Sequence, residues 1–159
     1  MNPTVYIETT IVGHLTSRLP NQPLVAGQML ETRRWWNESR PRFECFTSQT
    51  VLDEIAKGDP QAAAERLEAL GSLRLVPITD AAIELAKLLL LRSALPEKAR
   101  VDAAHVAIAA TNAAQYLLTW NCRHLANATL RAKIEAVCRE TGFTPPIICT
   151  PSELSEVYP

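Results

Sequence analysis

The chemistry that this sequence could support begins with a carboxylate and an amide placed just beyond two short apolar segments. Glu8 follows residues 4–7, and Asn121 follows residues 116–119 after one intervening residue. Both segments are rich in β-branched, aromatic or aliphatic residues, which is typical of buried strands. In open parallel sheets, ligands bind outside the carboxyl ends of the strands. We therefore expect these two side chains to contribute to one site.

Two further carboxylates belong to segments expected to be helical. Glu54 lies six residues after Ser48, a good helix N-cap, and Asp102 lies early in an alanine-rich segment. Clustered carboxylates repel one another unless a cation neutralises them, and Mg²⁺ or Mn²⁺ prefers oxygen ligands. Such an ion can activate water and stabilise charge on a phosphate, which is the chemistry of phosphodiester hydrolysis. The predicted catalytic and metal-binding residues are Glu8, Glu54, Asp102 and Asn121.

Each of these residues also has an explanation that needs no metal. Glu8 could be a surface residue at a strand end, and Glu54, beside Asp53, could lie on a solvated helix face. Asn121 is a common turn or cap residue. Asp102 would gain at most about 1 kcal/mol from a helix N-terminus, but its sequence neighbours are apolar, and buried acids are rare unless paired. Asp102 is therefore the hardest of the four to explain without a partner.

Other polar residues are expected to support the site. Thr9 and Thr119 flank the strand-end residues and are predicted to donate hydrogen bonds to carboxylates; Ser48 is predicted to support the same site. Arg123, two residues after Asn121, is the candidate for contact with a substrate phosphate.

Two further features have alternative interpretations. His105 lies three residues after Asp102, on the same helix face, so it either hydrogen-bonds a carboxylate of the site or is a core histidine, which is favoured. The arginines and tryptophans within residues 33–42 suit contact with RNA. An amphipathic helix with buried tryptophans and solvated arginines is the favoured explanation of that cluster.

The elements that must position these residues alternate along the chain. Strands are expected at residues 4–7, 43–47, 73–78, 116–119 and 146–149. Helices are expected at residues 25–40, 49–57, 61–70, 80–92, 97–114 and 124–141, with a closing turn from 151. This alternation predicts a three-layer α/β/α sandwich with a mostly parallel central sheet. With no internal repeat or linker, residues 1–159 are expected to form one domain.

Composition narrows the class of protein. Hydrophobic residues make up 47% of the chain and charged residues 21%, as in ordinary globular proteins. A net charge of −1 gives no global attraction to nucleic acid. Four dispersed cysteines without a C-x-x-C pair argue against structural zinc, and with no secretory signal they predict free thiols in a reducing cytoplasm. Lys87 and Arg92 interrupt the longest apolar stretch, so no transmembrane helix is expected.

The order of four motifs, VYIETT, SQTVLDEI, VDAAHVAIA and YLLTWN, resembles the PIN-domain ribonucleases, particularly the VapC-like toxins of type II toxin–antitoxin pairs. The resemblance covers nearly the whole chain. It implies a Rossmann-like fold, an acidic pocket holding Mg²⁺ or Mn²⁺, cleavage of single-stranded RNA or tRNA, a homodimer and a small antitoxin partner. By this resemblance Glu8 stands for the family's first-strand aspartate and Glu54 for its helix glutamate. Asp102 matches the later aspartate, and Asn121 stands where many members have a fourth.

Glu8 and Asn121 depart from the family pattern. Glu8 is one methylene longer than aspartate, and Asn121 offers a carbonyl oxygen without charge. The expected function is a metal-dependent endoribonuclease whose pocket carries three negative charges where many relatives carry four. The alternative is a weakened or inactive module that binds RNA or a protein. A small-molecule-binding protein of the flavodoxin or response-regulator kind is disfavoured, because no glycine-rich loop follows the first strand.

Overall fold

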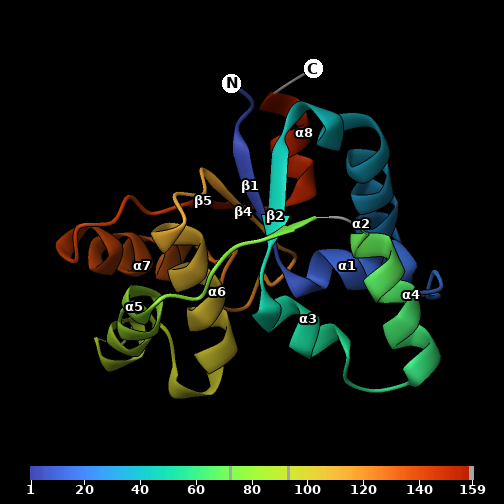
Figure 1. Cartoon of the computed structure of the whole chain (residues 1–159). Coiled ribbons are helices and arrows are strands. Elements are labelled where there is room, and N and C mark those ends of the chain that lie inside the picture. The colour runs from blue at the N-terminus through green and yellow to red at the C-terminus, as the bar shows by residue number, and fades with distance from the viewer. Residues whose placement is uncertain (72, 93, 158–159) are drawn as a thin grey trace.

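A central parallel sheet organises the protein. The computed structural model describes residues 1–71, 73–92 and 94–157 (Figure 1). Its strands are β1 (Thr4–Ile7), β2 (Glu44–Thr47), β3 (Arg74–Leu75), β4 (Tyr116–Leu118) and β5 (Ile147–Cys149). They lie in the order β3-β2-β1-β4-β5, and every paired strand is parallel to its neighbour. The predicted parallel sheet is confirmed.

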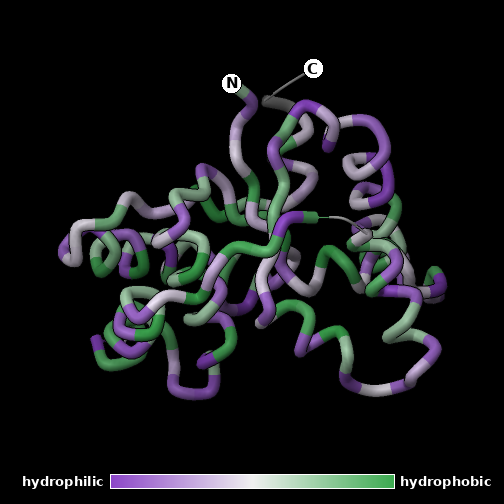
Figure 2. Tube along the Cα trace, in the orientation of Figure 1, coloured by the Kyte–Doolittle hydropathy of each residue, from purple (hydrophilic) through white to green (hydrophobic). Residues whose placement is uncertain are grey.

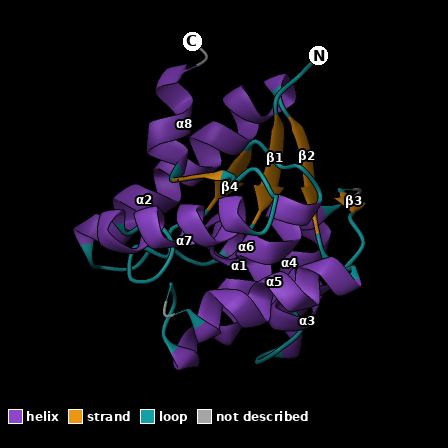
Figure 3. Cartoon of the chain, turned by 90° about the vertical axis from the view of Figure 1, so that its left-hand side faces the viewer, coloured by secondary structure: helices purple, strands orange, loops and turns teal. Residues whose placement is uncertain are grey.

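Helices cover both faces of this sheet. They are α1 (Thr9–Thr16), α2 (Pro23–Arg34), α3 (Gln49–Ile55), α4 (Pro60–Leu70), α5 (Asp80–Leu91), α6 (Arg100–Thr111), α7 (Ala128–Glu140) and α8 (Pro151–Val157). Helices α5, α6 and α7 lie on one side of the strands and α1, α2 and α4 on the other (Figure 1). In Figure 3 the side formed by α5, α6 and α7 faces the viewer, and β1 and β2 are visible above these helices. The predicted three-layer α/β/α architecture is therefore confirmed.

The central strand β1 marks the change of direction in the sheet. From β1 the chain builds outward through β2 to β3, and it later returns to the other side of β1 to form β4 and β5. Val5, Tyr6 and Ile7 are completely buried. In open parallel sheets, ligands commonly bind where the strand order reverses, at the carboxyl ends of the two adjacent strands, here β1 and β4.

Helix α6 is the interior helix that its alanine content predicts. Ala103, Val106, Ala107 and Ala109 have no exposed surface, and the helix packs between α5 and the sheet. Small side chains allow this close approach. The outer helices instead alternate hydrophobic and hydrophilic residues along the trace (Figure 2), as expected for helices with one face on the core. In the described residues, no helix combines the length and apolar character needed to cross a bilayer.

Helix ends account for most differences from the predicted boundaries. Helix α2 ends at Arg34 and continues as a π turn (Trp35–Ser39) and a 3₁₀ turn (Arg40–Arg42). A 3₁₀ turn (Glu97–Ala99) likewise precedes α6. Thr79 caps α5 as predicted, because its Oγ1 accepts from the backbone N–H of Ala82 at 3.2 Å.

One predicted helix start is confirmed without its expected capping bond, and another is wrong. Ser48 occupies the N-cap position of α3, but its hydroxyl binds Tyr6 and caps no backbone amide. The helix predicted from residue 124 begins at Ala128, because the backbone N–H groups of Leu125 and Ala126 both bind the carbonyl of Asn121 and make a turn. The side chain of Asn127 then caps α7.

Candidate metal centre

Glu8 stands at the junction of β1 and α1, where its side chain caps the helix. Its Oε2 accepts hydrogen bonds from the backbone N–H of Thr10 (3.1 Å), from Thr10 Oγ1 (2.5 Å) and from Thr119 Oγ1 (2.7 Å). The residue is only 3% exposed. A buried carboxylate with three donors on one oxygen has a fixed direction.

Glu54 approaches the same place from α3. Its Oε1 accepts from Thr9 Oγ1 at 2.5 Å and lies 2.6 Å from His105 Nε2. Partial burial opposes ionisation of this carboxyl, but the hydrogen bonds from His105 and Thr9, together with electrostatic attraction to His105 and Lys57, hold its pKa below the ordinary value. Glu54 is therefore an ionised group at neutral pH.

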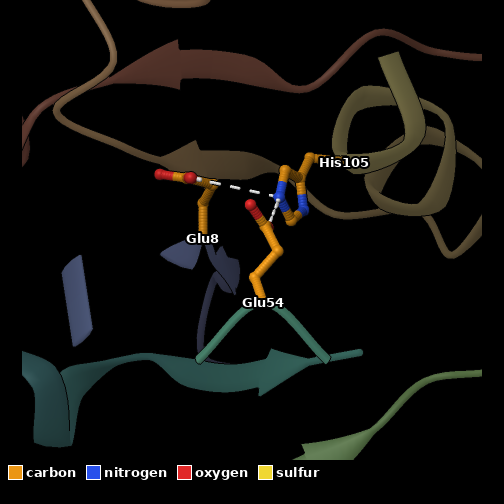
Figure 4. Close-up of side chains that lie close together, drawn as sticks. All are labelled: Glu8, Glu54 and His105. Atoms are coloured by element: carbon orange, nitrogen blue, oxygen red, sulfur yellow. Dashed lines mark hydrogen bonds and ion pairs between the residues drawn. The ribbon is translucent and has the colours of Figure 1, made fainter. Parts of the chain in front are cut away.

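The structure gathers Glu8, Glu54 and His105 into one cluster. Their possible ligand atoms all lie within 4.8 Å of one another, and His105 Nε2 is 4.0 Å from Glu8 Oε1 (Figure 4). The three side chains come from the β1–α1 junction, α3 and α6, and they meet near the carboxyl ends of β1 and β4. Of the four predicted ligands, Glu8 and Glu54 belong to this cluster, whereas Asp102 lies outside it in the described part of the chain.

His105 is both a core residue and a partner of the site. It is 1% exposed, as the favoured interpretation predicts, yet it also contacts Glu54, as the other interpretation predicts. Its Nδ1 lies 2.8 Å from the hydroxyl of Tyr6, which lies 2.7 Å from Ser48 Oγ. Burial raises the pKa of Tyr6 well above its ordinary range, so its hydroxyl stays protonated.

Sequence reasoning missed Tyr6 as a functional residue. One signal was present, because residues two apart in a strand share a face, and Tyr6 is two residues before Glu8. Its apolar neighbours made it look like an ordinary core aromatic residue. Thr10 was missed in the same way, although it gives Glu8 two of its three hydrogen bonds.

Asp102 and Asn121 bind each other next to the cluster. Asn121 Nδ2 donates to Asp102 Oδ1 at 2.9 Å, and His124 Nδ1 lies 2.9 Å from Asp102 Oδ2. Asn121 Oδ1 accepts from the backbone N–H of His124 at 3.0 Å, which fixes the orientation of the amide. The oxygen that Asn121 could offer to a metal is thus already a hydrogen-bond acceptor.

Thr119 connects this pair to Glu8. Its Oγ1 accepts from the backbone N–H of Asn121 at 2.9 Å and donates to Glu8 Oε2. Asp102 therefore reaches the carboxylate cluster indirectly, through Asn121 and Thr119.

The remaining supporting residues have mixed outcomes. Thr119 donates to Glu8, as expected. Thr9 is next to Glu8 in sequence, but it donates to Glu54. Ser48 reaches the site through Tyr6. Arg123 is exposed, and its side chain forms no ion pair within the part of the chain that is described.

The cluster of arginines and tryptophans is largely structural. Trp35 is completely buried, and the guanidinium of Arg40 stacks 4.6 Å from the ring centre of Trp36. Arg34 forms ion pairs with Glu31 and Glu38 of its own helical segment. These contacts support the amphipathic-helix explanation.

The cluster suits a hard divalent cation. In the described residues, no hydrogen bond reaches Glu8 Oε1 or Glu54 Oε2, so each carboxylate has one anchored and one available oxygen. Mg²⁺ is commonly bound by one or two carboxylates together with waters and substrate phosphates. Comparison of the chain with protein-family models, with curated proteins and with solved structures found no match, so the family is not assigned.

Proposed function

We propose that this protein is a metal-dependent endoribonuclease that hydrolyses RNA phosphodiester bonds at the Glu8–Glu54 cluster. One observation carries the proposal: two carboxylates from separate elements are held close together, each with one oxygen anchored and one available. Neither forms a salt bridge with lysine or arginine in the described residues. A divalent cation is the natural neutraliser of such a pair.

The proposed cofactor is Mg²⁺ or Mn²⁺, which the carboxylates of Glu8 and Glu54 would hold. When bound, this ion would supply activation of a water molecule and stabilisation of charge on the phosphate. The protein contributes rigidity. Three donors fix Glu8 and two fix Glu54, so little reorganisation is needed when the ion and the substrate bind.

In this proposal Asp102 acts at a distance. Asp102 accepts a hydrogen bond from the side chain of Asn121. The backbone N–H of Asn121 donates to the hydroxyl of Thr119, and this hydroxyl donates to Glu8. Exposed Arg123, next along the same turn, is the proposed contact for a substrate phosphate. Local cations must provide such contacts because the net charge of the chain is −1.

RNA as the substrate rests on the motif resemblance described above. The same resemblance supports three further proposals: a role as a toxin acting in the cytoplasm, a homodimer, and a small antitoxin partner. Expression of the chain is then expected to arrest growth, and a co-expressed neighbouring small gene to relieve the arrest. Strong expression without any effect on growth or total RNA would contradict the toxin role.

Cleavage of a fluorescent single-stranded RNA tests the catalytic proposal. Activity should require Mg²⁺ or Mn²⁺, disappear with EDTA, and fall by at least about 100-fold in Glu8→Gln and Glu54→Gln, because each removes a ligand charge. Asp53→Asn is the matched control, since Asp53 is the exposed neighbour of Glu54 on the same helix and contacts Gln49. Cleavage that persists in EDTA, or in both glutamine variants, would contradict the proposal.

A second candidate is a non-catalytic module that binds RNA or a protein. It is favoured by the mutual hydrogen bonding of Asp102 and Asn121, which leaves two of the four predicted ligands outside the cluster. RNA or protein binding that is unaffected by EDTA, in a chain that cleaves no RNA, would support this candidate over the first.

A further inference from the structure

The imidazole of His105 has two possible roles at the proposed metal centre. Its Nε2 could bind the cation, or it could carry a proton and hold Glu54 in place. We infer that His105 is a positioning residue and not a metal ligand, and that Tyr6 and Ser48 fix it in the tautomer protonated at Nε2. This inference rests on the proposed function only for its effect on metal binding; the tautomer itself can be measured without metal.

The direction of a buried hydrogen-bonded chain decides the tautomer. Ser48 Oγ, Tyr6 Oη and His105 Nδ1 follow one another at 2.7 and 2.8 Å. Ser48 and Tyr6 have no exposed surface, and His105 is 1% exposed. Each hydroxyl has one proton to donate. The order of donors and acceptors along this series is therefore the one that gives every hydroxyl proton an acceptor.

That direction runs from Ser48 to the ring. If Ser48 donates to Tyr6 and Tyr6 donates to His105 Nδ1, both hydroxyl protons are used. In the reverse direction the Ser48 proton needs another acceptor, and Ser48 Oγ makes no other hydrogen bond in the described structure. Leaving a buried donor unpaired is costly, which selects the first direction.

The protonation of His105 Nε2 follows from this direction of donation. Because Nδ1 accepts a hydrogen bond, the proton of the neutral ring is on Nε2, where it donates to Glu54 Oε1 at 2.6 Å. A nitrogen that carries a proton has no lone pair for a cation.

The consequence is a centre with two carboxylate ligands. His105 and Thr9 both donate to Glu54 Oε1, which turns the other oxygen of Glu54 toward the space shared with Glu8. Without an imidazole ligand, the centre lacks the nitrogen donor that strengthens binding of Zn²⁺ and Ni²⁺, and it keeps the oxygen donors that suit Mg²⁺ and Mn²⁺. Water and phosphate oxygens would complete the coordination of the ion.

Nitrogen-15 NMR of the imidazole ring provides the direct test. Long-range proton–nitrogen correlations distinguish a protonated Nε2 from a protonated Nδ1. We expect the Nε2–H pattern for His105 in metal-free protein, and the same pattern after addition of diamagnetic Mg²⁺. A ring protonated at Nδ1 in either state would overturn the inference.

Substitutions test the functional consequence. In His105→Gln the side-chain amide keeps an N–H donor near the position of Nε2, whereas His105→Leu removes it. Calorimetric titration with Mn²⁺ should give an affinity within about 3-fold of wild type for glutamine and at least about 10-fold weaker for leucine. Tyr6→Phe keeps the ring packing and removes the hydroxyl, so it should shift the nitrogen-15 resonance of Nδ1, whereas the proton stays on Nε2 because the Glu54 carboxylate accepts it. Equal loss of affinity in the glutamine and leucine variants would overturn the positioning role.

The two proposals fail in different ways. If wild type binds neither Mg²⁺ nor Mn²⁺, the proposed function fails, and the tautomer in metal-free protein still decides the assignment of Nε2. If Glu54→Gln weakens Mn²⁺ binding while His105→Gln weakens it as much as His105→Leu, the positioning role fails and the metal site stands.

Discussion

At the scale of single residues, hydroxyl groups decide where the two carboxylates point. Thr10 and Thr119 donate to one oxygen of Glu8, and Thr9 donates to one oxygen of Glu54. One oxygen of each carboxylate is thereby held by hydrogen bonds, and the other oxygen remains available to a cation. A site built this way is rigid before the ion arrives, which favours binding of the ion without rearrangement.

The ionised state of Glu54 predicts a dependence of stability on pH. Its pKa is lower in the folded chain than the ordinary value of 4.5, so the folded state favours the carboxylate. This contribution is complete above about pH 5 and is lost as the pH falls through the folded value. In metal-free buffer, urea unfolding should therefore show a stability difference between wild type and Glu54→Gln that changes below pH 4.5, to the disadvantage of wild type. A difference independent of pH between 3 and 6 would contradict the assignment.

Sequence alone could identify Glu8 and Glu54 but not their surroundings. Glu8 directly follows the strand-like residues 4–7, and Glu54 lies six residues after Ser48 within the motif SQTVLDEI. The pairing of His105 with Glu54 spans 51 positions in sequence, and that of Tyr6 with His105 spans 99. Periodicity describes only neighbours along the chain, so contacts of this range emerge only when the layers pack.

At the scale of elements, short turns after strands determine which side chains enter the site. The turn that follows β4 folds back on the carbonyl of Asn121, which brings His124 against Asp102. The predicted continuous helix from residue 124 would have carried His124 away. Polar side chains that bind their own backbone compete with helix formation, and this competition is hard to predict from residue pattern.

Two glycines provide a matched test of how helices begin and end here. Gly142 ends α7 at φ +87°, where its N–H binds the carbonyl of Arg139; Gly27 lies within α2. Among the described atoms, a Cβ at either position would meet nothing within 4 Å. Only the backbone conformation therefore distinguishes them.

Alanine at the two positions should have opposite effects. Gly142→Ala should destabilise the protein by about 1 kcal/mol, because L residues disfavour positive φ. Gly27→Ala should stabilise it by up to about 1 kcal/mol, because alanine is the better helix former. Urea unfolding measures both changes, and a shift of the same sign in the two variants would contradict the assigned end of α7.

At the scale of the whole molecule, the order of the strands creates the site. Residues 8 and 119 are far apart in sequence, yet β1 and β4 are adjacent, with Ile7 paired to Leu118. The alternation of strands and helices was enough to predict a parallel sheet. It could not give the order β3-β2-β1-β4-β5, because that order depends on how the helices cover the two faces.

The packing of the core predicts the reactivity of the cysteines. Burial raises the pKa of the thiols of Cys45 and Cys149 to about 12 and that of Cys138 to about 11, whereas Cys122 is exposed. A buried, protonated thiol is a poor nucleophile. A thiol reagent at pH 8 should therefore modify exposed Cys122 rapidly in the native chain, partly buried Cys45 more slowly, and buried Cys138 and Cys149 only after denaturation, as followed by mass spectrometry. Modification of Cys149 as fast as Cys122 would contradict this packing.

The central claim is that Glu8 and Glu54 together hold a divalent cation. Calorimetric titration of metal-free protein with Mn²⁺ tests it most directly, using Glu8→Gln, Glu54→Gln and the control Asp53→Asn. We predict saturable binding by wild type and by the control, and at least about 10-fold weaker binding by each glutamine variant. Equal Mn²⁺ affinity in wild type and in both glutamine variants would contradict the account.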